Sequence, residues 1–154
     1  MKRIVLLLGI ILVSTSLFAQ EGEAPLSKGD MQINFGLGFG YWGLPVYAAM
    51  DFAVHDDVTV GPDISAIFDF DRNTAYFGVA ARGDYHFNRI IGIPNEWDFY
   101  AGARLGFRAG SNFDGLFGIQ VGGRWYWNDR WGLNLEFGGG YNSFAVRTGV
   151  SLKL

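Results

Sequence analysis

The stretch WGLNLEFGGGYNSFAVRTGVSLKL, residues 131–154, decides the fold of this chain. Apolar residues alternate with polar residues or glycine up to residue 141, and the alternation resumes at residue 144. Successive residues of a β-strand point to opposite faces, so the pattern predicts two strands, each with one apolar and one polar face. The pair Asn142-Ser143 between them is typical of a tight turn.

The same alternation extends back to residue 31. It predicts eight strands, at 31–41, 46–54, 58–69, 75–87, 97–108, 115–127, 131–141 and 144–154. Segments rich in Gly, Pro, Asn and Asp separate them. Soluble proteins use strands of about 5 or 6 residues. Ten tilted strand residues climb about 25 Å, which is the height of the apolar band on a membrane barrel.

One row of every predicted strand carries no charge. This apolar row is too extensive for the core of one small soluble domain, so we expect it to face lipid. An open sheet would leave unpaired N–H and C=O groups in lipid, whereas eight strands can close with every pair antiparallel. The sequence therefore predicts an all-β protein, a closed up-and-down antiparallel eight-stranded transmembrane β-barrel. Pro62 cannot donate to a strand ladder, so we expect a β-bulge at Gly61-Pro62.

Aromatic residues gather near the ends of the predicted strands. Their amphipathic rings favour the boundary between water and lipid. We therefore predict an aromatic girdle at each rim of the barrel. The main members are Phe87, Trp97, Trp125, Trp127 and Trp131 at one rim, and Tyr41, Trp42 and Tyr141 at the other.

The opposite row holds six acidic and six basic residues. They are Asp51, Asp63, Asp69, Asp84, Asp98, Glu136, Arg82, Arg104, Arg108, Arg124, Arg147 and Lys153. Side chains fill the interior of an eight-stranded barrel, and an unpaired charge there is costly. We predict an interior network of salt bridges whose main members are Asp51, Asp63, Arg82, Asp84, Arg104, Arg124, Glu136 and Arg147. Charged rings also line ion-selective pores, so a narrow conductance remains an alternative to a purely structural network.

The N-terminus has the three parts of a secretory signal peptide. Lys2 and Arg3 precede an apolar stretch at 4–13, and a more polar tail follows at 14–20. The apolar stretch is too short to span a bilayer as a helix. We expect a signal peptide at 1–20, a short flexible periplasmic leader at 21–30 and the transmembrane barrel domain at 31–154. An uncleaved N-terminal anchor is the alternative.

The sequence gives little support for enzyme chemistry. The chain has no cysteine, which excludes a disulfide framework and a thiol nucleophile. Its net charge of −3 comes without a basic patch, so nucleic acid is not an expected partner.

Histidine is too sparse to suggest a catalytic site. A serine nucleophile needs a base within hydrogen-bond reach, yet Ser111 and Ser143 lie at the rim opposite to His55 and His86. The run Asp56-Asp57 beside His55 resembles a metal cluster only weakly, because turns are commonly rich in Asp. We expect no enzyme activity, no cofactor and no metal.

Three segments within residues 85–102 are similar to segments that recur in a known family: YHFN at 85–88, GIP at 92–94 and WDFYAG at 97–102. With the signal pattern, the eight strands and the apolar C-terminal residue, they resemble the small OmpA/OmpX-type outer-membrane β-barrels. The resemblance covers 30–154 and implies a monomer in the outer membrane of a Gram-negative bacterium. It also implies contact with outer-membrane lipids and with the barrel-assembly machinery through the C-terminal strand.

Two departures from that family pattern stand out. Leu154 replaces the usual terminal Phe, and the expected surface loops are short, which argues against adhesion through long loops. The sequence therefore favours a structural or narrow porin-like role. Two alternatives remain: a lipid-modifying barrel enzyme, which needs a Ser/His pair at the outward rim, and a soluble lipocalin-like ligand-binding barrel, which needs charge on its outer row.

Overall fold

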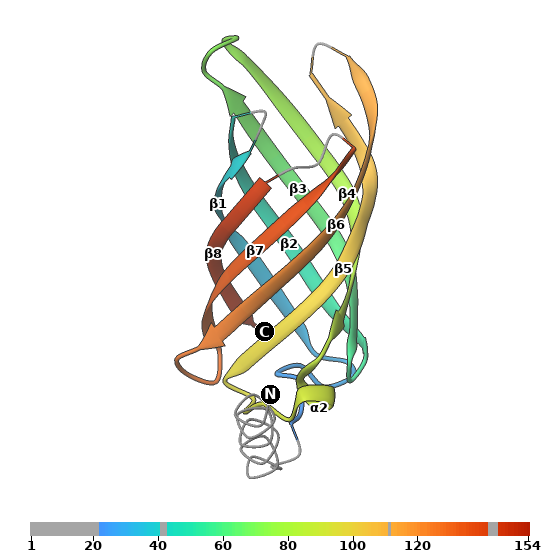
Figure 1. The fold of residues 1–154 in the computed structure, drawn as a ribbon, viewed down its shortest axis with the longest axis vertical. Helices are drawn as coiled ribbons and strands as arrows, with labels where there is room; N and C mark the ends of the chain where they lie inside the picture. The colour runs from blue at the N-terminus through green and yellow to red at the C-terminus, as the bar shows by residue number, and fades with distance from the viewer. Residues whose placement is uncertain (1–21, 41–42, 111, 142–144) are drawn as a thin grey trace, which may run out of the picture.

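The computed structural model describes residues 22–40, 43–110, 112–141 and 145–154, and it forms a closed barrel of antiparallel strands (Figure 1). Each strand pairs with the next, and the last pairs with the first. This confirms the predicted fold class, an all-β, closed, up-and-down, eight-stranded barrel. The strands are β1 (Met31–Gly40), β2 (Leu44–His55), β3 (Val58–Asp69), β4 (Thr74–His86), β5 (Trp97–Ala109), β6 (Phe113–Tyr126), β7 (Trp131–Tyr141) and β8 (Ala145–Lys153).

The strand boundaries lie within two residues of the predicted ones where the structure describes them. β2 and β6 each begin two residues early, because Leu44 pairs with Phe68 and Phe113 pairs with Ala109 at the ends of long ladders. The expected signal peptide at 1–20 lies outside the described residues. So do Tyr41, Trp42, Ser111 and Ser143.

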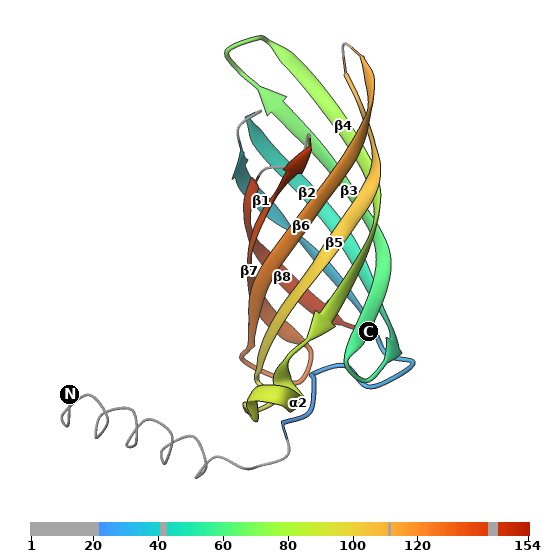
Figure 2. The ribbon, with the colours of Figure 1, turned by 45° about the vertical axis from the view of Figure 1, so that its right-hand side comes forward.

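The two ends of the barrel differ. The end that we call the leader end carries residues 22–30, the β2–β3, β4–β5 and β6–β7 connections, and the C-terminus (Figure 2). At the far end, the β3–β4 and β5–β6 hairpins rise above the others (Figures 1 and 2). The β4–β5 connection contains a single helical turn, α2 (Asn88–Ile91), which Gly92 ends with a left-handed φ of 62°. Within the described ranges, no helix is long and apolar enough to cross a membrane.

The expected bulge at Gly61-Pro62 is wrong. The β3–β4 register runs through Pro62 without a shift, and the irregularity toward β2 lies between Ala53 and His55. Gly61 lies against the carbonyl oxygen of Met50, where an added Cβ would overlap that oxygen. The missing side chain lets the two backbones approach beside the proline, so the strand passes Pro62 without an extra residue.

The leader differs from the flexible segment that we expected. Leu26 is only 4% exposed. The backbone N–H of Gly29 donates to the Ala53 carbonyl at 2.8 Å, and the side-chain amide of Asn88 donates to the Glu23 carbonyl at 3.3 Å. Residues 22–30 thus lie between α2 and β2 across the leader end (Figure 2).

The barrel has apolar side chains on its outer wall and polar side chains in its interior, which is the opposite of the arrangement in a soluble protein. Leu105, Ile119 and Val79 on the outer row are 68%, 64% and 61% exposed. The completely buried side chains are mainly polar or charged, among them Arg124, Gln32 and Asp51. Successive residues alternate between the two environments, so the polar row of each strand meets the polar rows of the others inside the barrel.

Candidate functional site

The interior charges meet at mid-barrel around Arg82 on β4. Its guanidinium lies 2.6 Å from Asp84 and 2.8 Å from Glu136. Asp51 and Asp63 are 3.6 and 3.8 Å away. Four carboxylates from four strands therefore share one cation. Such close pairing offsets part of the cost of removing the charges from water.

Glu136 on β7 is the matching anionic centre. One of its oxygens accepts from Arg82 at 2.8 Å and from the Tyr100 hydroxyl at 3.2 Å. The other accepts from Arg104 at 2.9 Å and lies 3.8 Å from Arg147. The carboxylate contacts three guanidinium groups, so the acidic and basic residues form one network instead of isolated pairs.

A second layer lies nearer the leader end. Arg124 donates to Asp51 at 2.7 Å and to Asp98 at 2.6 Å, and thereby links the central cluster to this layer. Asp51 also accepts from the side-chain amides of Gln32 and Asn34, at 2.8 and 2.9 Å. These three donors all reach Oδ2 of Asp51, whereas its buried Oδ1 accepts no hydrogen bond from the described residues and lies 3.6 Å from Arg82.

The structure places all eight predicted network residues inside the barrel and joins them. Asp63 accepts from Arg147 at 2.5 Å, and Asp84 accepts from the Gln120 amide at 2.9 Å. The other charges of the row lie toward the ends. Asp69 pairs with Arg72 at 3.1 Å, and the guanidinium of Arg108 stacks over Tyr76.

The inward tyrosines were missing from the sequence prediction. The Tyr47 hydroxyl donates to Asn134 at 2.5 Å, and the Tyr126 hydroxyl donates to Gln32 at 2.6 Å. Tyr100 lies under the Arg124 guanidinium, 4.1 Å from ring centre to cation. Cations attract aromatic ring faces, so these tyrosines bind charge and fill volume. The sequence could have predicted these interior tyrosines, because each lies on the inward row of the alternating pattern.

Thr59, His86 and Asp98 lie in line near the leader end. The Thr59 hydroxyl is 3.0 Å from His86 Nε2, and His86 Nδ1 is 2.7 Å from Asp98. This order of hydroxyl, imidazole and carboxylate matches a nucleophile, base and orienting acid. Each of the three residues is at most 2% exposed. Sequence reasoning missed the arrangement because it sought a serine at the other rim.

The described members of the predicted girdles lie on the outer wall. At the leader end, the rings of Trp97 and Trp125 are 6.2 Å apart, and Trp97 stacks on Phe99 at 6.3 Å. Trp127 and Trp131 are partly exposed beside them, and Phe87 packs edge-on against Tyr85. At the far end, Tyr141 is 66% exposed.

The His55 turn holds a basic partner for its acidic pair. Arg89 of α2 lies 3.7 Å from Asp56 and 3.4 Å from Asp57. The backbone N–H of Lys28 donates to Asp56 at 2.9 Å, and this bond lowers the pKa of the exposed carboxyl. Across the described ranges, no three His, Cys, Asp or Glu residues are arranged to hold a metal ion. The turn instead connects the leader and α2 to the barrel.

Similarity to known proteins is found in the structure and not in the sequence. No protein-family model matches the sequence, and no curated protein sequence matches it. Among solved structures, it is similar to the N-terminal β-barrel domain of Pseudomonas aeruginosa OprF, with 13% identity, a TM-score of 0.66, and coverage of 84% of this chain and 100% of that one. Neisserial surface protein A is 13% identical with a TM-score of 0.60, over 81% and 95% of the two chains. A de novo designed transmembrane β-barrel is 16% identical with a TM-score of 0.61, over 84% and 98%.

Proposed function

We propose that this chain, which has the fold of the small eight-stranded outer-membrane barrels, is an integral outer-membrane protein of a Gram-negative bacterium with a structural, non-conducting interior. The observation that carries this proposal is the central cluster. Arg82 lies within 3.8 Å of four carboxylates, and Glu136 lies within 3.8 Å of three guanidinium groups. The interior of an eight-stranded barrel is only wide enough for side chains to fill it, which supports a barrel without an ion path.

The outer wall supports a membrane location. A soluble lipocalin-like barrel would present charge to water, whereas this wall exposes large apolar residues such as Phe107 and Ile119 between two sets of aromatic rings. The leader end faces the periplasm in this proposal, because the signal pattern precedes the leader. Outer-membrane lipids surround a monomer, and the assembly machinery recognises β8.

Membrane fractionation followed by gel electrophoresis tests the location. We expect the chain in the outer-membrane fraction, with faster migration before boiling than after it, because a closed barrel stays compact in detergent. Recovery only in the soluble fraction would contradict the proposal.

Conductance across a planar bilayer tests the filled interior. We expect no resolved channels from the refolded wild type. The double variant Arg82→Ala/Glu136→Ala removes two long side chains of opposite charge, so it should conduct if it folds. Its heat-modifiable migration checks the folding. Steady ion-selective channels from the wild type would favour a narrow pore over the structural role.

A lipid hydrolase is a second candidate, favoured by the arrangement of Thr59, His86 and Asp98. We propose that this trio is structural, because all three side chains are buried and His86 and Arg124 share the Asp98 carboxylate. Release of fatty acid from phospholipid vesicles distinguishes the two. We expect none above background. Release that disappears in Thr59→Val would establish an enzyme.

A further inference from the structure

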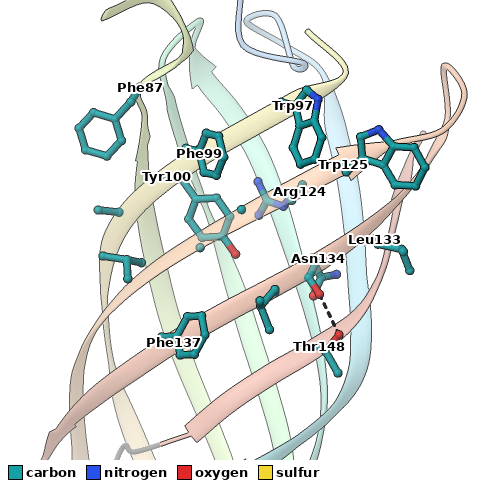
Figure 3. Close-up of a pocket in the computed structure, with 15 residues that line it drawn as sticks. Phe87, Trp97, Phe99, Tyr100, Arg124, Trp125, Leu133, Asn134, Phe137 and Thr148 are labelled. Carbon is teal, nitrogen blue, oxygen red and sulfur yellow. Dashed lines mark hydrogen bonds between the residues drawn. The ribbon is translucent and has the colours of Figure 1, made fainter. Parts of the chain in front are cut away.

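The outer wall carries an apolar groove of about 700 Å³ near the leader end (Figure 3). We call it the wall groove. It crosses β5, β6 and β7 and reaches β8, and most of its lining belongs to the row that faces away from the interior. The residues that shape it are Trp97, Phe99, Ala101, Gly123, Trp125 and Phe137. Its volume lies within the range of ligand pockets, about 300–1,000 Å³.

Small residues create the groove. Ala101 on β5 and Gly123 on β6 occupy outward positions where other strands carry large side chains. The Phe99 ring leans over Gly123, 3.1 Å from the position that a Cβ would take. Trp97 and Trp125 stand at one end of the groove, and Phe137 and Thr148 lie toward the other (Figure 3). Gly123 therefore makes room for the Phe99 ring, and Ala101 leaves a low floor between the aromatic walls.

The lining of the wall groove offers few polar atoms to a ligand. Thr148 is its outward hydroxyl, and that hydroxyl already donates to the Asn134 carbonyl at 3.1 Å. The inward Arg124 donates through both Nη groups to Asp98 and Asp51, and its Nε, which has no partner among the described residues, is buried; Asn134 accepts from Tyr47. An occupant needs apolar contact along its length and no hydrogen bonds. A hydrocarbon chain meets that requirement.

The position of the groove indicates the source of that chain. Indole rings favour the boundary between headgroups and hydrocarbon, so the Trp97 and Trp125 end lies at this boundary and the Phe137 end lies deeper. Arg130 is exposed on the turn that joins β6 to β7, at the same end. Its Nε donates to the Lys153 carbonyl at 3.5 Å, and the rest of its guanidinium can meet a phosphate at the membrane surface only if a lipid headgroup lies there. The groove thus begins at the end of the barrel that carries this exposed basic group.

We propose that the wall groove holds one acyl chain of a phospholipid from the periplasmic leaflet as a retained lipid, distinct from the freely exchanging lipids around the barrel. This rests on the proposed function, which places the barrel in the outer membrane with its leader end toward the periplasm. A chain in the groove touches protein on several sides. A chain on a convex wall touches it on one side only.

Two alanines on the same strand provide a matched test. Ala101 lines the groove, whereas Ala103 is the next outward residue of β5 and lies outside it. Ala101→Leu fills the groove, and Ala103→Leu adds the same side chain to the open wall. Each protein is refolded into vesicles of phosphatidylethanolamine and phosphatidylglycerol, extracted in mild detergent and weighed by native mass spectrometry.

We expect the wild type and Ala103→Leu to retain one phospholipid per barrel, and Ala101→Leu to retain at least about fivefold less. Equal retention by the two variants, no retained lipid on an inserted wild type, or a dimer that Ala101→Leu dissociates would each overturn the proposal. Heat-modifiable migration from the same vesicles is recorded first. A wild type that fails to insert would contradict the proposed function instead, so the two failures are distinguishable.

Discussion

At the centre of the barrel, Arg82 lies within 3.8 Å of Asp51, Asp63, Asp84 and Glu136. A charge removed from water is tolerated only when partners surround it, and removing one partner costs more than the pair contributes. Loss of Arg82 would leave these four carboxylates with fewer cations between them. We therefore expect its removal to destabilise the barrel mainly through the repulsion and burial of these carboxylates.

Replacement of Arg82 by Met tests this at the level of one side chain. Arg82→Met keeps much of the volume and removes the charge, so we expect it to lower the free energy of unfolding by about 3–5 kcal/mol. The urea midpoint of the vesicle-inserted barrel measures the change. Arg72→Met, at the barrel rim, is the comparison and should lower the midpoint much less, because Arg72 is largely exposed and has one carboxylate partner, Asp69, in place of four. Equal shifts in the two variants would argue against a central role for Arg82.

Among the elements of the fold, the leader is the one whose docking on the barrel the sequence does not predict. Its composition is polar, yet Leu26 is buried and Gly29 pairs with Ala53 of β2. The β2–β3 turn and α2 provide its other contacts, through Asp56 and Asn88. Two apolar side chains, Ala24 and Leu26, and a few hydrogen bonds hold the leader, so its opening requires less free energy than opening a strand.

Leu26→Ser should release the leader while the barrel stays closed. Burial of this leucine is the main apolar contribution to docking, and serine removes it. We expect faster amide hydrogen exchange in residues 22–30 and at Ala53, whose N–H donates to the Asp30 carbonyl, and unchanged exchange in the rest of β2 and in β3. Lys28→Ser, at an exposed position, is the control and should exchange like the wild type. Slow exchange in both variants would show that the hydrogen bonds suffice.

Alternation predicted the strands well because it reports a local property, the face on which each side chain lies. It separated the inward Arg82 from its outward neighbour Ala81 with no knowledge of pairing. It could not predict that Arg82 meets Glu136, because that contact depends on the register across several strands. The bulge at Pro62 failed for a related reason, since the proline's effect depended on how closely Gly61 approaches Met50.

For the whole molecule, the charges that matter most for stability are shielded from the solvent. Salt screens exposed charges, with a Debye length of about 3 Å at 1 M, but it acts much less on buried pairs. The central network is buried, whereas Asp56 and Arg89 are exposed at the leader end. Electrostatic stabilisation of the barrel should therefore respond little to ionic strength.

Urea unfolding at two salt concentrations measures this for the intact barrel. We expect nearly the same midpoint at about 0.05 M and about 1 M sodium chloride, because ions do not reach the interior pairs. Vesicles without net charge keep the membrane constant. A large loss of stability at high salt would show that surface pairs dominate instead.

Interior hydrogen bonds join parts of the chain that are remote in sequence, and this has a consequence for how the barrel forms. Ser151 binds Asn34 across 117 residues, and Tyr126 binds Gln32 across 94. A half-rolled sheet in the bilayer would leave such groups, and the charges beside them, turned toward hydrocarbon without partners. We therefore expect the curling of the sheet and the pairing of β1 with β8 to occur in one cooperative step. Ser151 on β8 then provides the hydrogen bond that Asn34 on β1 needs.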